Sequence, residues 1–420
     1  MHVILVTMGS AGDLFPFLWI GRALRERGHR VDFVGPDLHA LYVDAAGLTF
    51  HGLPADPAVL DHPDLWHPTR GLAVVWDATR PAMAQLPVMV AALDSGKDTL
   101  LLVHPLALPE ADMCRHNRPG LRIAATWLAP SNLPTVHDPL LLGPWPVPTW
   151  VPHGVRRWLW RTLAARFIDP VALPGLNLAR QERGLPRVRS LIDYIQTIPD
   201  LSLALFPDWF AAPVPDWPQP LVQVGFPLYD PDPDAAPSAT LRAFLAAGAP
   251  PVVFTPGTGN RQAGRYFEAA AHAVTQLGLR AIFLTPHREQ LPGSLPPSIC
   301  WQDYVPLKAL LPHVAALVHH GGIGTTAEAL RAGTPQLVVP LAHDQFDNAA
   351  RVVALGAGVS LHATKVTARR MGDALSTLID DDRYTRRCAE IAMSQAQGPG
   401  IDGLCAALET LVSHPSHVHG

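Results

Sequence analysis

Apolar and polar positions follow one another along the chain in a pattern that predicts strands alternating with helices. The opening HVILVT is a short apolar run, and the glycine-containing GSAGDLFPF and the helical pattern LWIGRALRERGHR precede a second run, VDFVGP. A strand, a glycine turn, a helix and another strand form a βαβ unit, which implies a parallel sheet. Four later runs are expected to complete this sheet: TLLLVHPLAL, RIAATW, LSLALFP and LVQVGFP.

A segment dense in proline and aspartate interrupts this pattern. Residues 227–240 read PLYDPDPDAAPSAT, a composition that favours neither helix nor strand and indicates a linker. The pattern then restarts with PVVFTPGTGN, a helix from about Tyr266 to Leu277, RAIFLTP, ALVHHGG, a further helix and QLVVPL. We therefore predict an α/β protein with two Rossmann-like doubly wound parallel sheets. The predicted parts are an N-terminal domain at 1–226, the linker at 227–240, a C-terminal domain at 241–400, and a helix and tail at 401–420.

Composition and charge narrow the possible functions. Of the 420 residues 48% are apolar and 16% charged, and the net charge of −4 argues against a nucleic-acid partner. Four scattered cysteines form no CxxC pair, which is typical of thiols in a reducing cytoplasm. The N-terminus lacks the basic region of a signal peptide, and no apolar run reaches the roughly 18 residues of a membrane span. A soluble cytoplasmic protein is expected.

Residues 150–169, WVPHGVRRWLWRTLAARFID, show a helical repeat of basic and apolar side chains. The basic ones are expected on one side of the helix and the apolar ones on the other: Arg156, Arg157 and Arg161 against Leu159, Leu163 and Phe167. Contact with a membrane surface or a lipid acceptor is one interpretation. An ordinary amphipathic helix packed on the core is the other, and it is the more frequent outcome.

The run VHHGGIGTTAEALRAGTPQ, at 318–336, ends an apolar strand with two histidines and three glycines before a helix begins. Glycines let the backbone turn sharply and approach a ligand closely. Thr325 is expected to cap the helix, with Glu328 as its capping-box partner. The free N–H groups and the positive dipole end of the helix suit an anion such as a diphosphate, to which His320 could donate a hydrogen bond. A plain strand-to-helix turn is the alternative.

The longer segment HHGGIGTTAEALRAGTPQLVVPLAHDQFDNAARVVALGAGV resembles the donor-binding signature of glycosyltransferase family 1, the UDP-glycosyltransferase-like enzymes of the GT-B fold. The likeness covers nearly the whole sequence and is strongest from Trp301 to Val359. Within the family the protein is most similar to the rhamnosyltransferase of rhamnolipid synthesis and to bacterial sterol and natural-product glycosyltransferases. The resemblance implies inverting, metal-independent transfer of a hexose from UDP-glucose or dTDP-rhamnose. The implied acceptor is a hydroxyl of a hydroxy-fatty-acid lipid, sterol or polyphenol, and no cofactor is implied.

The same resemblance implies a set of donor-binding residues. His320, the backbone of the glycine turn, and the hydroxyls of Thr258 and Thr325 would contact the diphosphate. Glu328 would hold the ribose, in competition with its capping role. The full set is Thr258, Tyr304, Val305, His320, Gly322, Ile323, Gly324, Thr325, Glu328, Asp344 and Gln345.

The remaining donor roles concern the base and the sugar. Tyr304 stands where the family usually has a base-stacking tryptophan, and backbone groups of Val305 would read the pyrimidine. Leu307 replaces a frequent glutamine, which leaves both uracil and thymine open. Asp344 and Gln345 match the pair that binds the donor sugar, although an aspartate at this place could also cap the next helix.

Glycosyl transfer to a hydroxyl requires a base to remove its proton. In GSAGDLFPF, Asp13 stands where the family usually has a histidine, which implies that Asp13 is the general base. Asp13 is also a good helix N-cap. Four residues are candidates for acceptor contacts: Phe15, His104, Trp127 and His137. Lone polar residues near strand ends often have a structural role instead, and this alternative applies to His104 and His137.

Other classes of function make different demands on the sequence. A dinucleotide-dependent oxidoreductase needs G-x-G-x-x-G and an acid after the second strand, but Gly9 and Gly12 form only G-x-x-G and VDFVGP ends without an acid. A nucleotide-sugar epimerase of the same architecture and a non-catalytic nucleotide-sugar binder remain as alternatives. DDDR at 380–383 is interpreted as a turn and helix cap, and the tail SHPSHVHG as a frayed terminus, so no metal site is expected.

Overall fold

The computed structural model describes residues 1–67, 69–96, 98–138, 141–142, 145–232, 235–394 and 400–413. The backbone forms two compact units. The first unit comprises Met1–Tyr229 and the C-terminal segment from Gly398, of which the described part is one helix. The second unit is Asp230–Gln397. The change from one unit to the other thus falls within the segment predicted to be the linker.

A seven-stranded sheet forms the centre of the first unit, and every pair of neighbouring strands in it is parallel. The strand order is β3-β2-β1-β4-β5-β8-β9, so it reverses between β1 and β4. In open α/β sheets ligands bind outside the carboxyl ends of the strands at such a reversal. The strands are β1 (His2–Val6), β2 (Arg30–Pro36), β3 (Thr49–Leu53), β4 (Thr99–Val103), β5 (Arg122–Trp127), β8 (Leu201–Ala204) and β9 (Leu221–Gln223).

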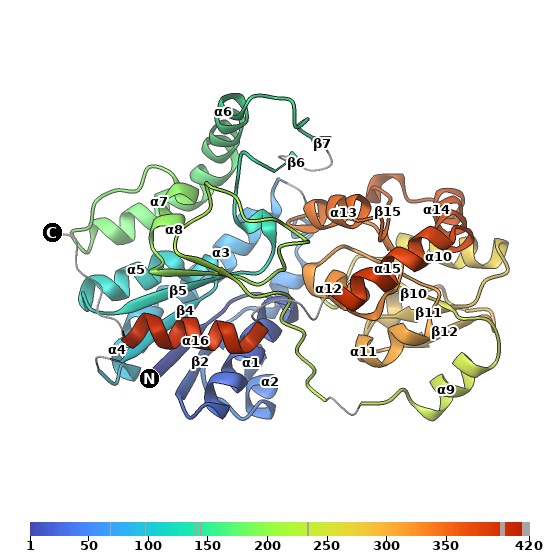
Figure 1. The fold of residues 1–420 in the computed structure, drawn as a ribbon, viewed down its shortest axis with the longest axis horizontal. Helices are drawn as coiled ribbons and strands as arrows, with labels where there is room; N and C mark the ends of the chain where they lie inside the picture. The colour runs from blue at the N-terminus through green and yellow to red at the C-terminus, as the bar shows by residue number, and fades with distance from the viewer. Residues whose placement is uncertain are drawn as a thin grey trace. The chain divides into compact units, whose positions relative to one another are not determined.

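Nine described helices surround this sheet, and the last of them comes from the end of the sequence. They are α1 (Ala11–Glu26), α2 (Ala40–Ala45), α3 (Gly71–Met83), α4 (Leu86–Leu93), α5 (Leu108–Asn117), α6 (His153–Leu163), α7 (Asp169–Gln181), α8 (Leu191–Thr197) and α16 (Gly400–Ser413). A π-helical turn at Ala164–Ile168 joins α6 to α7, and a short antiparallel pair, β6 (Leu141–Leu142) and β7 (Trp145–Pro146), precedes α6. Figure 1 shows α16 beside α1 on this unit.

The second unit repeats the doubly wound plan with six parallel strands in the order β12-β11-β10-β13-β14-β15. The order reverses between β10 and β13. Helices α10 and α14 pack on one face of the sheet, and α9, α11 and α12 on the other. The strands are β10 (Val252–Thr255), β11 (Ala281–Leu284), β12 (Ile299–Gln302), β13 (Ala316–His319), β14 (Gln336–Val338) and β15 (Gly358–Ser360). The helices are α9 (Ala239–Ala246), α10 (Gly264–Gln276), α11 (Leu307–Leu310), α12 (Ile323–Ala332), α13 (Gln345–Ala354), α14 (Ala368–Asp380) and α15 (Asp382–Ser394).

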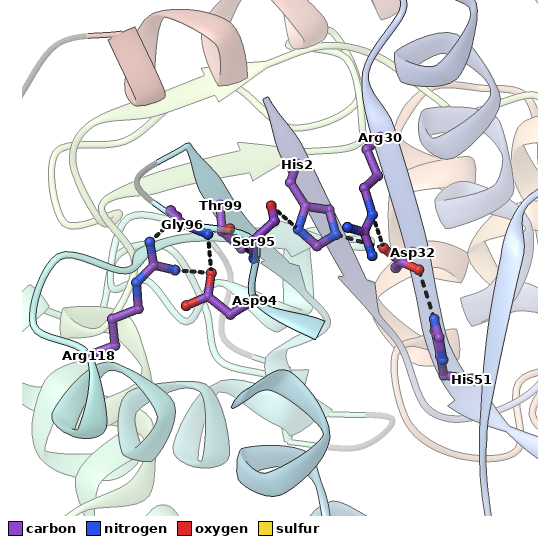
Figure 2. A network of polar contacts seen from close by, with 9 residues as sticks. All are labelled: His2, Arg30, Asp32, His51, Asp94, Ser95, Gly96, Thr99 and Arg118. Carbon is purple, nitrogen blue, oxygen red and sulfur yellow. Dashed lines mark hydrogen bonds and ion pairs between the residues drawn. The ribbon is translucent and has the colours of Figure 1, made fainter. Parts of the chain in front are cut away.

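A polar network ties together the amino ends of the strands in the first unit (Figure 2). Asp32 is buried, and its carboxylate binds the Nε2 atoms of His2 at 2.7 Å and His51 at 2.8 Å and accepts from Arg30 Nε at 2.9 Å. Burial alone would raise the pKa of Asp32, but the hydrogen bonds from His51 and His2 and the charge of Arg30 hold it below its usual value. The network lies at the opposite ends of the strands from the candidate site, so we assign it a structural role.

The prediction of two doubly wound α/β domains is confirmed, and two local expectations can be compared with the structure. Arg156 was expected on the basic side of its helix, but it is buried and donates to the carbonyl oxygens of Val136 and Pro148. DDDR forms the predicted turn between α14 and α15, with Arg383 bound to the carboxylate of Asp381. The expected frayed tail, 413–420, lies outside the described residues apart from Ser413. Within the described part of the sequence, none of the helices combines the length and apolar character needed to cross a bilayer.

Candidate active site

The glycine turn after β13 prepares a helix N-terminus for a ligand. Gly321 adopts a left-handed conformation with φ 93°, Gly322 is the N-cap residue, and α12 begins at Ile323. The expectation that Thr325 caps this helix is therefore wrong, because Thr325 already lies in the first helical turn. No side chain of a described residue caps this N-terminus. The first N–H groups of a helix lack partners within the helix, so those of α12 are available to an anion.

The imidazole of His320 is held between two glycines. Gly257, in the turn after β10, has φ 91°, and a Cβ atom there would lie 2.8 Å from Cε1 of His320. A Cβ atom on Gly322 would lie 2.5 Å from Nε2 of the same ring. Only glycine lets the backbone approach the ring this closely. This contact brings the TPGTG turn, with its exposed Thr258, next to His320. Thr258 and His320 are both predicted from the sequence to bind the diphosphate.

Burial keeps this imidazole uncharged. It lowers the pKa of His320 to about 4, so the ring is neutral at pH 7. Nδ1 of His320 is buried and has no hydrogen-bond partner among the described residues. A buried polar atom without a partner is costly in free energy. A ligand oxygen that accepted a hydrogen bond from this ring would remove that cost.

The preceding histidine, His319, fixes the shape of the turn and was not singled out from the sequence. It is fully buried, and its Nδ1 accepts from the N–H of Gly321 at 3.1 Å. Its Nε2 lies 2.9 Å from Oε1 of Gln336, the first residue of β14, and therefore carries the proton. Burial, with a smaller contribution from His320, lowers the pKa of His319 to about 3. The sequence signal for this residue was a histidine at the end of an apolar strand, followed by a second histidine and two glycines.

The loop before α13 is tied to the same turn. Asn348, another buried residue not picked from the sequence, donates to the carbonyl oxygen of Gly321 at 2.9 Å and to Oδ2 of Asp344 at 2.7 Å. Gln345 is also buried, and its Oε1 accepts from the N–H groups of Leu341 and Ala342. The side-chain oxygen of Gln345 thus holds its own loop. The two residues expected to bind the sugar are fixed against the glycine turn.

The remaining donor candidates occupy the same end of the sheet. Tyr304, after β12, is 57% exposed, whereas the side chain of Val305 is buried in the core under α9 and α11. Glu328 does not act in a capping box. Its carboxylate binds Arg331, which also binds Asp230 at 3.1 Å. Burial raises the pKa of Glu328, and the charge of Arg331 opposes that shift.

In the first unit, Asp13 lies at the carboxyl end of β1, within the first turn of α1. Its Oδ2 accepts from the N–H of Ser10 at 2.9 Å, and Ser10 is the N-cap residue, so Asp13 is not the N-cap. Gly9 has φ 121°, and a Cβ atom there would lie 2.2 Å from Oδ2 of Asp13. The turn thus needs a glycine so that the carboxylate can occupy this place.

Two histidines support Asp13 from neighbouring strands. Nε2 of His104, after β4, lies 3.6 Å from Oδ1 of Asp13, while its Nδ1 accepts from the N–H of Leu106 at 3.3 Å. The proton of a neutral ring therefore resides on Nε2, facing the carboxylate. Burial lowers the pKa of His104, and the charge of Asp13 only partly opposes this. His39, after β2, was not identified from the sequence, and its Nε2 donates to the carbonyl oxygen of Gly9 at 3.0 Å.

The other acceptor candidates differ in their surroundings. Phe15 packs against Tyr42 and Tyr229, with ring centroids 5.9 and 5.8 Å away. Trp127 is fully buried at the end of β5, so we correct its assignment to the core. His137 stacks edge-on against His153, the first residue of α6, at 4.6 Å. Among the described residues, no group of three or more His, Cys, Asp or Glu side chains could hold a metal ion.

Comparison with known proteins agrees with this architecture. Residues 3–99 match the glycosyltransferase family 28 N-terminal domain, and residues 268–411 match the erythromycin biosynthesis protein CIII-like C-terminal domain. The crystal structure of the glycotransferase of kitacinnamycin superposes with a TM-score of 0.76 at 21% identity, covering 98% of this chain and 99% of that chain. The fold is GT-B.

Two further relatives share the GT-B likeness over almost their full length. The O-mycaminosyltylonolide 6-deoxyallosyltransferase of Streptomyces fradiae is 29% identical over 434 residues, with 97% of each chain covered. The spinosyn rhamnosyltransferase SpnG, solved with thymidine diphosphate, has a TM-score of 0.67 at 23% identity, covering 97% of this chain and 100% of that chain. These likenesses support a glycosyltransferase. In this GT-B protein, Asp13 and His320 each lie at the strand-order reversal of their own sheet.

Proposed function

We propose that this protein is an inverting, metal-independent glycosyltransferase. It moves a hexose from a nucleoside-diphosphate sugar, UDP-glucose or dTDP-rhamnose, to a hydroxyl of a small hydrophobic acceptor. The observation that carries the proposal is the uncapped N-terminus of α12 beside His320, a neutral imidazole pressed between Gly257 and Gly322. A helix N-terminus with free N–H groups is well suited to bind a diphosphate.

The second unit supplies the donor chemistry in this proposal. The first-turn N–H groups of α12, one N–H of His320 and the hydroxyl of Thr258 bind the diphosphate oxygens. Negative charge grows on the diphosphate as its bond to the anomeric carbon breaks, and fixed donors stabilise that charge without reorganisation. The same charge raises the pKa of His320 towards its usual value. Asp344 and Gln345 bind the sugar, Glu328 the ribose and Tyr304 the base.

The first unit supplies the base. The carboxylate of Asp13 takes the proton of the acceptor hydroxyl as its oxygen attacks the anomeric carbon, and the electron pair of the breaking bond leaves with the diphosphate. Attack from the face opposite the leaving group inverts the configuration. The N–H of Ser10 and the Nε2–H side of His104 orient the carboxylate. His104 is thus a positioning residue for the base.

An apolar surface beside α1 favours a hydrophobic acceptor. Phe15, Tyr42 and Tyr229 form an aromatic cluster, and Tyr42 and the nearby Leu38 and Leu41 are exposed. The relative from Streptomyces fradiae takes O-mycaminosyltylonolide, and spinosyn aglycone is bound in another structure of the spinosyn rhamnosyltransferase. We therefore place polyketide aglycones beside sterols, polyphenols and hydroxy-fatty-acid lipids in the acceptor class.

The proposal is tested by incubating the protein with UDP-glucose or dTDP-rhamnose and a panel of these acceptors, with products identified by mass spectrometry. The Asp13→Asn variant should lose about 100-fold or more in kcat, while its affinity for the nucleoside diphosphate stays unchanged. Asp44→Asn, which changes an exposed carboxylate of the same unit, should keep full activity. Full turnover by Asp13→Asn would remove Asp13 from the mechanism. An epimerised nucleotide sugar as the product, or nucleotide binding without any product, would favour the two alternatives.

A further inference from the structure

Large apolar side chains are exposed along α6 and the segments that flank it. Trp158, in the middle of the helix, is 63% exposed, and Trp150, just before it, is 81% exposed. Val155 and Phe167 are also among the exposed large hydrophobic residues. In Figure 1, α6 lies at the edge of the first unit. Two exposed tryptophans on one helical segment are unusual for a surface that contacts only water.

The segment that forms this surface is basic and contains no acidic residue. Arg157, Arg161 and Arg166 are exposed between and beside the apolar side chains. Residues 139–168 contain no Asp or Glu, and Asp169, where acidic residues resume, uses Oδ1 to accept from the N–H of Leu191. The positive charge of this surface is therefore not compensated within the segment.

The fold holds this surface in place through Arg156. This buried guanidinium donates to the carbonyl oxygens of Val136, Pro148 and Thr149, which ties the segment carrying Trp150 to α6. Because Arg156 is turned inward, it carries no charge to the surface, and the exposed arginines and tryptophans share the outward side. The arrangement is preformed, so little conformational entropy would be lost on binding.

We propose that this surface, hereafter the α6 face (Trp150, Val155, Arg157, Trp158, Arg161 and Phe167), docks on the surface of an anionic phospholipid membrane. Tryptophan is enriched at the boundary between lipid and water, where its ring is apolar and its N–H is hydrated. Arginines interspersed with such rings are attracted by anionic headgroups, the combination typical of helices that lie in the membrane plane. A second copy of the protein would present the same uncompensated arginines, and the two like-charged faces would repel. The proposed membrane docking does not depend on the proposed glycosyltransferase activity.

The test is flotation of the full-length protein with phosphatidylcholine vesicles and with vesicles that contain about a third phosphatidylglycerol, at low and high salt. The protein should float with the anionic vesicles, and binding should fall at least tenfold with neutral vesicles or at high salt. Trp158→Ser and the double variant Arg157→Gln/Arg161→Gln should each lose at least tenfold in vesicle affinity. The matched controls Leu178→Ser and Arg187→Gln change an exposed leucine and an exposed arginine of the same unit, and both should bind like the wild type.

Three results would overturn the proposal. They are the absence of flotation with anionic vesicles, equal binding by the α6-face variants and the controls, and binding that does not depend on lipid charge. Light scattering of the same variants tests the remaining possibility, which is that the α6 face is an interface between protein copies. If Trp158→Ser converts a dimer to a monomer and leaves vesicle binding unchanged, the α6 face is an interface between protein copies and not a lipid-binding surface.

Discussion

At the scale of single residues, three histidines of the candidate site each hold a neighbouring group through a ring nitrogen. His319 accepts from Gly321 and donates to Gln336, and His104 accepts from Leu106 and faces Asp13. His39 donates to Gly9 in the same way. Each of the three fixes the backbone or the carboxylate that is proposed to meet a substrate.

Gly257 combines close packing against a histidine with a left-handed backbone conformation. In Gly257→Ala the new Cβ atom would clash with the His320 ring at a left-handed φ of 91°. We expect the second unit to lose about 1–3 kcal/mol of stability and to bind nucleoside diphosphates more weakly. Thermal denaturation and calorimetric titration measure both effects. Gly293→Ala is the control, because its Cβ atom would meet no atom within 4 Å. Equal behaviour of the two variants would refute the packing argument.

The pH dependence of stability tests the buried state of His319. Its pKa is lowered to about 3 in the folded protein, so the unfolded state binds the proton at a higher pH than the folded state does. The stability that the neutral, buried His319 contributes is therefore lost as the pH falls below about 6.5. Between pH 7 and pH 5 the wild type should lose about 2 kcal/mol through this group, whereas His319→Gln should not. Urea unfolding at the two pH values checks this, and an identical pH dependence in both proteins would contradict it.

At the scale of elements, the predictions succeeded where apolar runs are long, but they missed three of the four strands at the edges of the two large sheets. The central strands of both sheets were located, but β3, β12 and β15 were not. All three are edge strands, and their sequences TFHGL, ICWQ and GVS are partly exposed and mix polar with apolar residues. An edge strand buries fewer side chains, so its apolar signal is weak. The start of α12 was misplaced because a threonine is the stronger local cap signal, whereas the turn itself requires the glycines.

The helix α16 provides a test of how elements assemble the first unit. Leu404, Cys405 and Leu408 are fully buried, and Glu409 binds Arg27 and His29. Ending the protein at residue 399 should therefore cost the first unit about 5 kcal/mol, mainly through the two leucines. Limited proteolysis should then cleave the first unit first, while the second unit still binds nucleotide. A protein that ends at residue 413 is the control, and equal resistance of the two truncated forms would show that α16 is dispensable.

At the scale of the whole molecule, the two doubly wound units could be located from the sequence, but the return of the C-terminal helix to the first one could not. Periodicity shows that a segment is helical, but it carries no information about which sheet the helix packs on. Similarly, the motifs predicted roles for Asp13, His320 and Thr258, but they drew no attention to His39, His319 or Asn348. The contacts that bring these three to the site come from strands and turns that are adjacent only after folding.

The central claim is that the His320 ring and the start of α12 bind the diphosphate of a nucleotide sugar. The most direct measurement is calorimetric titration of thymidine and uridine diphosphates into the wild type and His320→Ala. A hydrogen bond to a charged group contributes about 1.5–3 kcal/mol, so the affinity should fall about 10- to 100-fold in the variant. It should be unchanged in the control His272→Ala, which alters an exposed histidine on α10. Equal affinity of His320→Ala and the wild type would contradict the account.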